Sequence, residues 1–176
     1  MSTIVAAFTS ANSTCMLADC RASAGDRYYS GVQKIVEYKD VRIGVTGFLP
    51  AVPAIADILR EHDFSFETST DVFSSVTEIR GMLVDHYGFD GTRADGEPLV
   101  LLPCTLLITT PTKIFEVLSG CEVLEVKDFS AIGSGAPYAL GSLATSHIGE
   151  KYLSPGDLRQ ALYAASCFDP GTDYRD

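Results

Sequence analysis

Three residues in the first part of this 176-residue chain could together perform acyl transfer: Ser2, Asp19 and Lys34. Removal of Met1, which a small second residue permits, would leave Ser2 with a free α-amine beside its hydroxyl. The ordinary pKa of such an amine is about 7.7–8.0, so near neutral pH an appreciable fraction can accept the hydroxyl proton. A neighbouring lysine would disfavour protonation of the amine, and an aspartate would hold that lysine in place. The pattern predicts a nucleophile and its general base on one residue.

Other catalytic patterns find no support in the sequence. The segment Gly133-Ser134-Gly135 lacks the Gly-Lys-Ser/Thr continuation of a phosphate-binding loop, and no GxSxG nucleophile elbow occurs. Five cysteines stand at irregular spacing without a nearby histidine pair, which argues against zinc and favours reduced thiols: Cys15, Cys20, Cys104, Cys121 and Cys167. We therefore expect chemistry that uses no metal and no organic cofactor.

The composition limits the partners and the location. The formal net charge is -10, and such a surface repels nucleic-acid phosphates and anionic membranes. The longest apolar run, residues 99–108, is interrupted by Pro103 and is shorter than the ~18 residues of a membrane span. The first residues show no basic segment before an apolar one, as a secretory signal would. The sequence predicts a cytoplasmic protein.

The hydrophobic pattern changes period along the chain and predicts four groups of elements. Runs rich in β-formers predict strands over 3–8, 15–19, 34–38, 41–46, 99–109, 113–118 and 121–126. Apolar residues at helical spacing predict helices over 51–62, from a cap at Ser69 or Thr70 to about Tyr87, over 137–147 and over 155–166. The polar composition of residues 90–97 predicts a loop, and Lys39-Asp40 predicts a hairpin turn.

This order, strands then two helices, twice over, is typical of antiparallel sheets faced by helices in an α+β protein. It differs from the strict alternation of parallel βαβ units. Asp19 ends the second predicted strand and Lys34 begins the third, so both could meet Ser2 at one end of a sheet. The chain length, 1–176, suits a single domain.

Four segments resemble a known family. The segments are Ser2-Thr3-Ile4-Val5, Ala18-Asp19-Cys20-Arg21-Ala22-Ser23, Ser30-Gly31-Val32-Gln33-Lys34-Ile35 and Ala131-Ile132-Gly133-Ser134-Gly135-Ala136-Pro137-Tyr138-Ala139. In order and spacing they resemble the bacterial HslV peptidase and proteasome β subunits, which are N-terminal-nucleophile (Ntn) hydrolases. The resemblance implies a four-layer αββα sandwich, with two antiparallel sheets between helical layers.

The resemblance also implies roles for five residues. Ser2 matches the nucleophile, Asp19 and Lys34 the charged pair, Ser134 the serine near the amine, and Gly47 the glycine whose N–H stabilises the oxyanion. It implies a threonine-type peptidase in a cytoplasmic homo-oligomeric ring, acting on unfolded proteins or peptides and supplied by an ATP-dependent unfoldase.

The chain departs from the family pattern in three places. The usual nucleophile is Thr, the residues 48–53 after Gly47 are bulkier than usual, and Asp169 and Thr172 match a C-terminal Asp and Ser/Thr only loosely. Two alternatives stay open: an Ntn amidase acting on small amides, and a catalytically silent subunit of a proteasome-like assembly.

Overall fold

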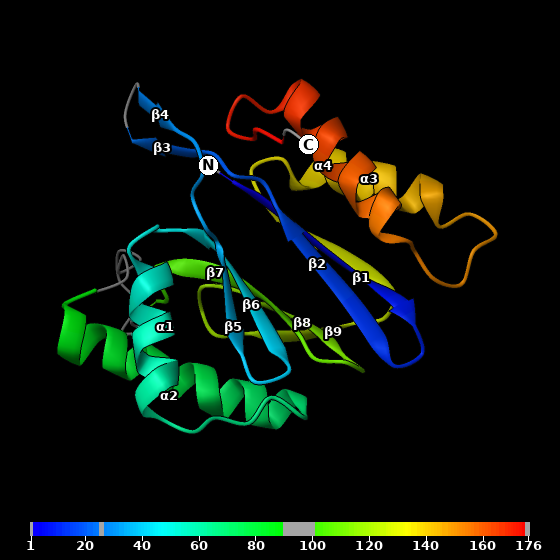
Figure 1. Ribbon diagram of the computed structural model, residues 1–176. Coiled ribbons are helices and arrows are strands. Elements are labelled where there is room, and N and C mark those ends of the chain that lie inside the picture. The colour runs from blue at the N-terminus through cyan, green and yellow to red at the C-terminus, as the bar shows by residue number, and fades with distance from the viewer. Residues whose placement is uncertain (1, 25–26, 90–100, 175–176) are drawn as a thin grey trace.

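Two antiparallel sheets lie face to face in the computed structural model, which describes residues 2–24, 27–89 and 101–174 (Figure 1). The smaller sheet has the strand order β10-β1-β2, and its strands are β10 (Phe129–Gly133), β1 (Thr3–Ser10) and β2 (Ser13–Ala18). The larger sheet follows chain order with β5 (Ile35–Tyr38), β6 (Val41–Gly47), β7 (Cys104–Thr109), β8 (Ile114–Val117) and β9 (Val123–Val126). A separate hairpin joins β3 (Ala22–Ala24) to β4 (Arg27–Tyr29).

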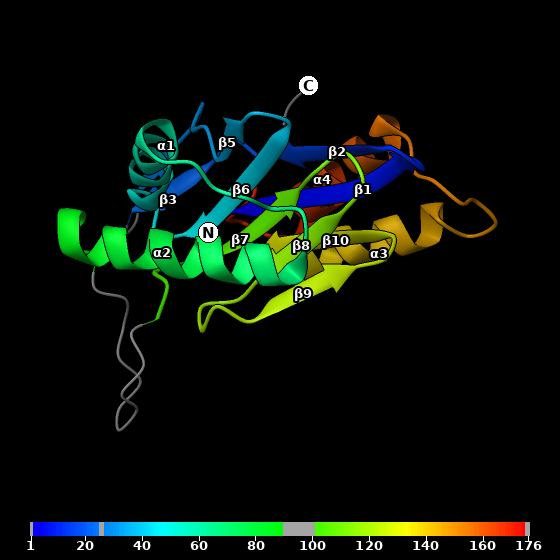
Figure 2. The same cartoon turned by 90° about the horizontal axis from the view of Figure 1, so that it is seen from below.

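Helices cover the outer face of each sheet. The larger sheet is covered by α1 (Ala51–Glu61) and α2 (Ser69–Tyr87), and the smaller by α3 (Ala136–Ser146) and α4 (Pro155–Phe168). Both ribbon views show this sequence of layers, helices, sheet, sheet, helices (Figures 1 and 2). The predicted four-layer αββα arrangement is confirmed.

The alternation of side chains along the central strands explains why both faces of each sheet are buried. In β1, Ile4 and Ala6 point into the space between the sheets, whereas Val5 and Ala7 pack against α3 and α4. In β7, Leu107 points between the sheets. Its neighbours on either side face α1 and α2. A strand covered on both faces has an unbroken apolar sequence, as these two do.

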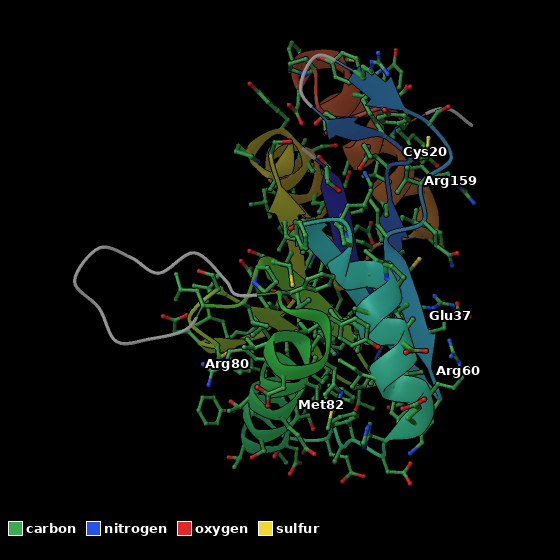
Figure 3. The ribbon with its side chains drawn as sticks, turned by 90° about the vertical axis from the view of Figure 1, so that its left-hand side faces the viewer. Cys20, Glu37, Arg60, Arg80, Met82 and Arg159 are labelled. Carbon is green, nitrogen blue, oxygen red and sulfur yellow. The ribbon has the colours of Figure 1, made fainter. Side chains whose placement is uncertain are left out.

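The solvent side of α1 carries charged residues. On α1, Arg60 pairs with Asp57 at 2.6 Å, and Figure 3 shows Arg60 at the edge of the molecule. The helix begins directly after Pro50, and its apolar stripe faces the larger sheet. This one-sided pattern is what the helical spacing predicts.

The predicted helices are confirmed within two residues at each end, with one correction at the start of α2. The cap of α2 is Thr68 instead of Ser69 or Thr70, because Thr68 and Asp71 stand three residues apart and form a reciprocal capping box. At α4, Ser154 forms the same motif with Asp157. Gly88 ends α2 in a left-handed conformation, which glycine adopts easily.

The strand predictions need more revision. The predicted strand over 99–109 begins at Cys104, after Pro103, which has no N–H for a sheet ladder. Two features were not predicted: β10, which lies in a short run that ends in glycine, and the β3–β4 hairpin, whose strands have only 3 residues each. The predicted polar loop 90–97 lies outside the described residues.

Candidate active site

Ser2 is held at the start of β1 by the turn that follows β10. Its carbonyl accepts the N–H of Ser134 at 2.8 Å, and its own nitrogen donates to Ser134 Oγ at 3.2 Å. Gly133 has a φ of 99°, and a Cβ at that position would overlap the Ser2 carbonyl. Only glycine therefore lets the two strands approach so closely at this point. Ser2 is 6% exposed.

One oxygen of Asp19 binds the groups around the nucleophile. Asp19 follows β2, and its Oδ1 accepts the Thr3 N–H at 2.8 Å, Lys34 Nζ at 2.5 Å and the Ser2 hydroxyl at 3.4 Å. The structure brings Ser2, Asp19 and Lys34 together, but not at one end of a single sheet as predicted: Ser2 and Asp19 flank strands of the smaller sheet, and Lys34 precedes β5 of the larger sheet. The Ser2 contact is the longest of the three, and its hydroxyl is the most loosely held.

The other oxygen of Asp19 fixes the carboxylate in place. Asp19 Oδ2 accepts the backbone N–H groups of Arg21 at 3.0 Å and of Asp173 at 3.2 Å. The Arg21 guanidinium in turn donates to the carbonyl of Pro170 and pairs with the Asp173 carboxylate. The segment after α4 thus closes over the carboxylate, a connection that the sequence did not indicate.

The Lys34–Asp19 ion pair is almost completely buried. The side chains are 2% and 0% exposed. Burial lowers the pKa of Lys34, and the hydrogen bond and charge of Asp19 offset this only in part, so the pKa of Lys34 lies below its ordinary value. Lys34 therefore loses its proton more readily than a surface lysine does. Its ammonium and the Ser2 hydroxyl contact the same oxygen of Asp19.

A second carboxylate, Asp169, supports the Ser2 nitrogen through Ser134. Ser134 Oγ donates to Asp169 Oδ2 at 2.7 Å, and Thr172 Oγ1 donates to the same oxygen at 2.6 Å. The Thr172 hydroxyl also meets that of Thr3 at 2.5 Å, which ties this cluster to β1. The sequence left Asp169 and Thr172 without a role; their three-residue spacing was the one available signal.

The hydrogen bonds to Asp169 favour its charged form. Burial raises the pKa of this carboxyl, but donors from Thr172, Ser134 and the Gly171 backbone outweigh burial, and the net pKa lies below the ordinary value. A charged Asp169 polarises the Ser134 hydroxyl, which faces the Ser2 nitrogen. The arrangement suits an amine that gains and loses a proton.

Gly47 ends β6 beside the nucleophile. Its φ is 104°, and a Cβ there would lie 3.1 Å from the Pro103 carbonyl oxygen. Gly47 and Ser2 line the same two hollows. The wider one has a volume of about 330 Å³ and is lined by Ser2, Thr46, Gly47, Leu102, Pro103, Cys104, Thr105, Ser119, Gly133 and Ser134. The narrower one has about 30 Å³ and is lined by Ser2, Arg21, Ala22, Ser23, Lys34, Val45, Thr46, Gly47 and Leu49.

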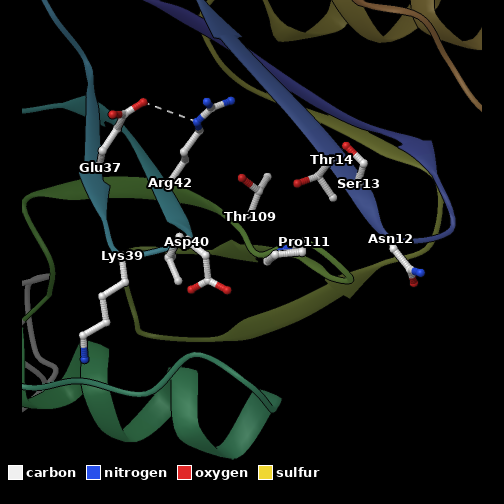
Figure 4. A pocket seen from close by; sticks show the side chains of 10 residues that line it. Asn12, Ser13, Thr14, Glu37, Lys39, Asp40, Arg42, Thr109 and Pro111 are labelled. Carbon is white, nitrogen blue, oxygen red and sulfur yellow. Dashed lines mark ion pairs between the residues drawn. The ribbon is translucent and has the colours of Figure 1, made fainter.

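A further hollow, of about 360 Å³, lies at the other end of the strands (Figure 4). It includes the turn after β1 and the hairpin turn at Lys39-Asp40, and Glu37 pairs with Arg42 across it at 3.4 Å. It contains none of the five predicted site residues, so we do not place the reaction there.

Among the described residues no group of three or more His, Cys, Asp or Glu side chains could hold a metal ion. Within the same part of the chain, no helix is both long and apolar enough to span a membrane. The five cysteines are free, and only Cys104 and Cys121 are buried.

Comparison with solved structures places this geometry in a known fold. BPH from Thiobacillus denitrificans matches with a TM-score of 0.84 and 23% identity, over 98% of this chain and 94% of that chain. BPH in complex with epoxomicin gives a TM-score of 0.85 at the same identity and coverage. HslV from Trypanosoma brucei gives 0.67 and 18% identity, over 97% of this chain and 94% of that one.

The chain has the HslV fold. The resemblance to HslV that the sequence motifs indicated is confirmed at the level of the fold, and so is the αββα class. No protein-family model and no curated protein sequence matches the chain. At 18–23% identity the HslV fold alone is shared, and the activity has to be argued from the residues themselves.

Proposed function

We propose that this protein is an Ntn peptidase of the proteasome and HslV type, with Ser2 as its nucleophile once Met1 is removed. One observation supports this best: Asp19 Oδ1 binds both the Ser2 hydroxyl and the buried Lys34 ammonium, while the Ser2 nitrogen contacts Ser134. The Ser2 hydroxyl, the buried ion pair and Ser134 are thus connected by hydrogen bonds, and the proposed scheme uses no metal or cofactor.

The reaction proceeds in two steps, acylation of Ser2 and hydrolysis of the acyl-enzyme. Ser2 Oγ attacks the peptide carbonyl and passes its proton to the α-amine, and the carbonyl oxygen becomes an oxyanion that accepts the Gly47 N–H. The C–N bond then breaks, and the α-ammonium returns the proton to the leaving amine, which leaves an ester on Ser2. Water then attacks that ester, with the α-amine taking the proton of water and passing it to Ser2 Oγ, and the carboxylic acid product is released.

Asp19 and Lys34 set the charge around this exchange. The Lys34 ammonium disfavours a second positive charge on the Ser2 amine, which keeps a fraction of the amine unprotonated and able to act as base. Asp169, through Ser134, stabilises the ammonium that forms transiently. Lys34 thus favours the neutral form of the Ser2 amine, and Asp169 favours its protonated form.

The proposal extends to substrate and assembly. Ser2 is only 6% exposed, so an extended peptide or unfolded chain reaches it more readily than a folded surface. Several large apolar side chains are exposed on and between α3 and α4, as expected where copies of a ring subunit meet: Tyr138, Leu140, Ile148, Tyr163 and Phe168. We propose a single 1–176 domain in a cytoplasmic homo-oligomeric ring, with an ATP-dependent unfoldase as partner on the strength of the sequence resemblance alone.

Covalent labelling tests the nucleophile. Epoxomicin, which BPH from T. denitrificans binds, carries a ketone next to an epoxide, and a residue with both a hydroxyl and a free amine can add to both. A short peptide epoxyketone should label Ser2 stoichiometrically, as peptide mapping by mass spectrometry would show. The Ser2→Ala variant should fold with an unchanged melting temperature, take no label and lose at least ~10³-fold in turnover. Labelling at a cysteine with Ser2 unmodified would overturn the proposal.

A further inference from the structure

The two hollows beside Ser2 differ about tenfold in volume. The wider one has about 330 Å³ and the narrower about 30 Å³, and both share Ser2, Thr46 and Gly47 as walls. A peptide whose carbonyl lies between Ser2 and Gly47 has one side chain toward each hollow. The direction of the peptide therefore decides whether the residue before or after the scissile bond faces the narrower hollow.

The position of the Ser2 nitrogen sets that direction. The leaving amine has to receive its proton from the Ser2 α-amine, which lies 3.2 Å from Ser134 Oγ. Ser134 and Gly133 line the wider hollow and are absent from the narrower one. The leaving half of the substrate thus occupies the wider hollow, and the residue that supplies the acyl group faces the narrower one.

The narrower hollow admits only a small side chain. A space of about 30 Å³ is two to three times the ~10–15 Å³ that one water molecule needs. Its apolar walls come from Ala22, Val45 and Leu49, of which Leu49 is the one that is exposed.

Its two cations are already engaged and offer no charge to a substrate. Lys34 pairs with Asp19, and Arg21 pairs with Asp173 and donates to the Pro170 carbonyl. An acidic side chain would find no unpaired cation there, and a basic one would meet two like charges. The acyl-side residue is thus small and uncharged.

The wider hollow suits a large uncharged residue. Leu102 and Cys104 are buried in its wall beside Pro103, five other lining residues carry hydroxyl groups, and none of the described residues that line it is charged. Burial raises the pKa of the Cys104 thiol to about 12, so this side chain is a neutral apolar wall and not a second nucleophile.

We propose that this site cuts peptide bonds that follow a small uncharged residue and precede a bulky uncharged one, with Leu49 limiting the size of the residue before the bond. The inference rests on the proposed function. It adds a substrate class that the two hollows define together.

A matched set of peptides tests the preference. Two internally quenched peptides differ only at the scissile pair, Ala-Phe in one and Phe-Ala in the other, and further members carry Leu, Asp or Lys before the bond. We expect kcat/KM to be at least ~10-fold higher for Ala-Phe than for the reversed pair, because a site gains or loses this much for a few buried methylenes. Equal or faster cleavage after Phe or Leu would overturn the inference.

Leu49→Ala should widen the narrow hollow and raise kcat/KM for Leu before the bond relative to Ala by ~10-fold or more. Cys104→Ala, which widens the other hollow instead, should keep the wild-type preference at that position. If both variants shift the preference equally, or neither does, the assignment of the hollows is wrong. If no peptide is cut and an epoxyketone with alanine next to its ketone leaves Ser2 unmodified, the proposed function itself fails; cleavage with the reverse preference defeats only the inference.

Discussion

Replacing Lys34 with methionine separates the structural and the chemical parts of the buried ion pair. The substitution shortens the side chain by one atom and removes its charge, leaving Asp19 as a carboxylate whose side chain is 0% exposed. Removing one partner of a buried pair costs about 3–5 kcal/mol. Three backbone N–H groups, from Thr3, Arg21 and Asp173, still bind Asp19, so we expect the lower end, about 3 kcal/mol.

For a domain of this size, 3 kcal/mol corresponds to a fall in melting temperature of roughly 6–12 °C. Lys39→Met is the matched control. Lys39 pairs with Asp63 at 3.0 Å, but the side chains are 58% and 94% exposed, and solvent screening leaves such a pair little effect on stability. Both variants lose one positive charge, so the comparison isolates burial.

Calorimetry and peptide hydrolysis are measured on both variants at the same pH and salt concentration. We expect Lys34→Met to melt lower and to lose activity at temperatures where it is fully folded, and Lys39→Met to match the wild type in both. Equal melting temperatures for the two variants would refute the reasoning about burial. A folded Lys34→Met variant with wild-type turnover would refute the role of the ammonium.

Three further predictions concern the surroundings of the nucleophile. Asp169→Asn should lower the melting temperature at pH 6, and the difference from the wild type should shrink toward pH 3. The pKa of Asp169 is lowered in the folded protein, so the stability that its charge contributes is complete above the ordinary value of 3.8 and is lost as the pH falls through the folded value. A difference in melting temperature that grows on acidification would contradict this. Gly133→Ala should displace the Ser2 carbonyl and abolish turnover, with a loss of stability of about 1 kcal/mol or more from the positive φ, measured by urea unfolding; wild-type turnover would show that the approach of the two strands is not required. Asp19→Asn should destabilise the fold, because both carboxylate oxygens accept backbone N–H groups and an amide NH₂ cannot replace either; thermal unfolding at the wild-type temperature would refute this.

The fold could be predicted well because its pattern is local. The apolar stripe of α1 and the capping signals of α4 depend on residues a few positions apart, and the spacing of the strands follows from short apolar runs. The strand β10 escaped prediction because its partner, β1, is more than a hundred residues away, and its sequence has no alternation of its own. The sequence of one strand alone does not indicate which distant strand it pairs with.

The site was predicted in part for the same reason. Ser2, Asp19 and Lys34 lie at strand ends that the sequence marks, so their meeting could be anticipated. The role of the segment after α4 could not, because Asp169 and Asp173 reach the site only through the packing of that helix against β1. The sizes of the two hollows depend on side chains from many segments and needed the structure.

The central claim is that Ser2 acts as nucleophile and base only when its α-amine is free. The most direct measurement uses a removable N-terminal extension that leaves Ser2 as the first residue when it is cut. Turnover of a peptide substrate is followed against the fraction of chains with a free Ser2 amine, determined by intact mass. We predict that activity is absent before cutting and rises in proportion to that fraction. Full activity in the uncut protein would contradict the account.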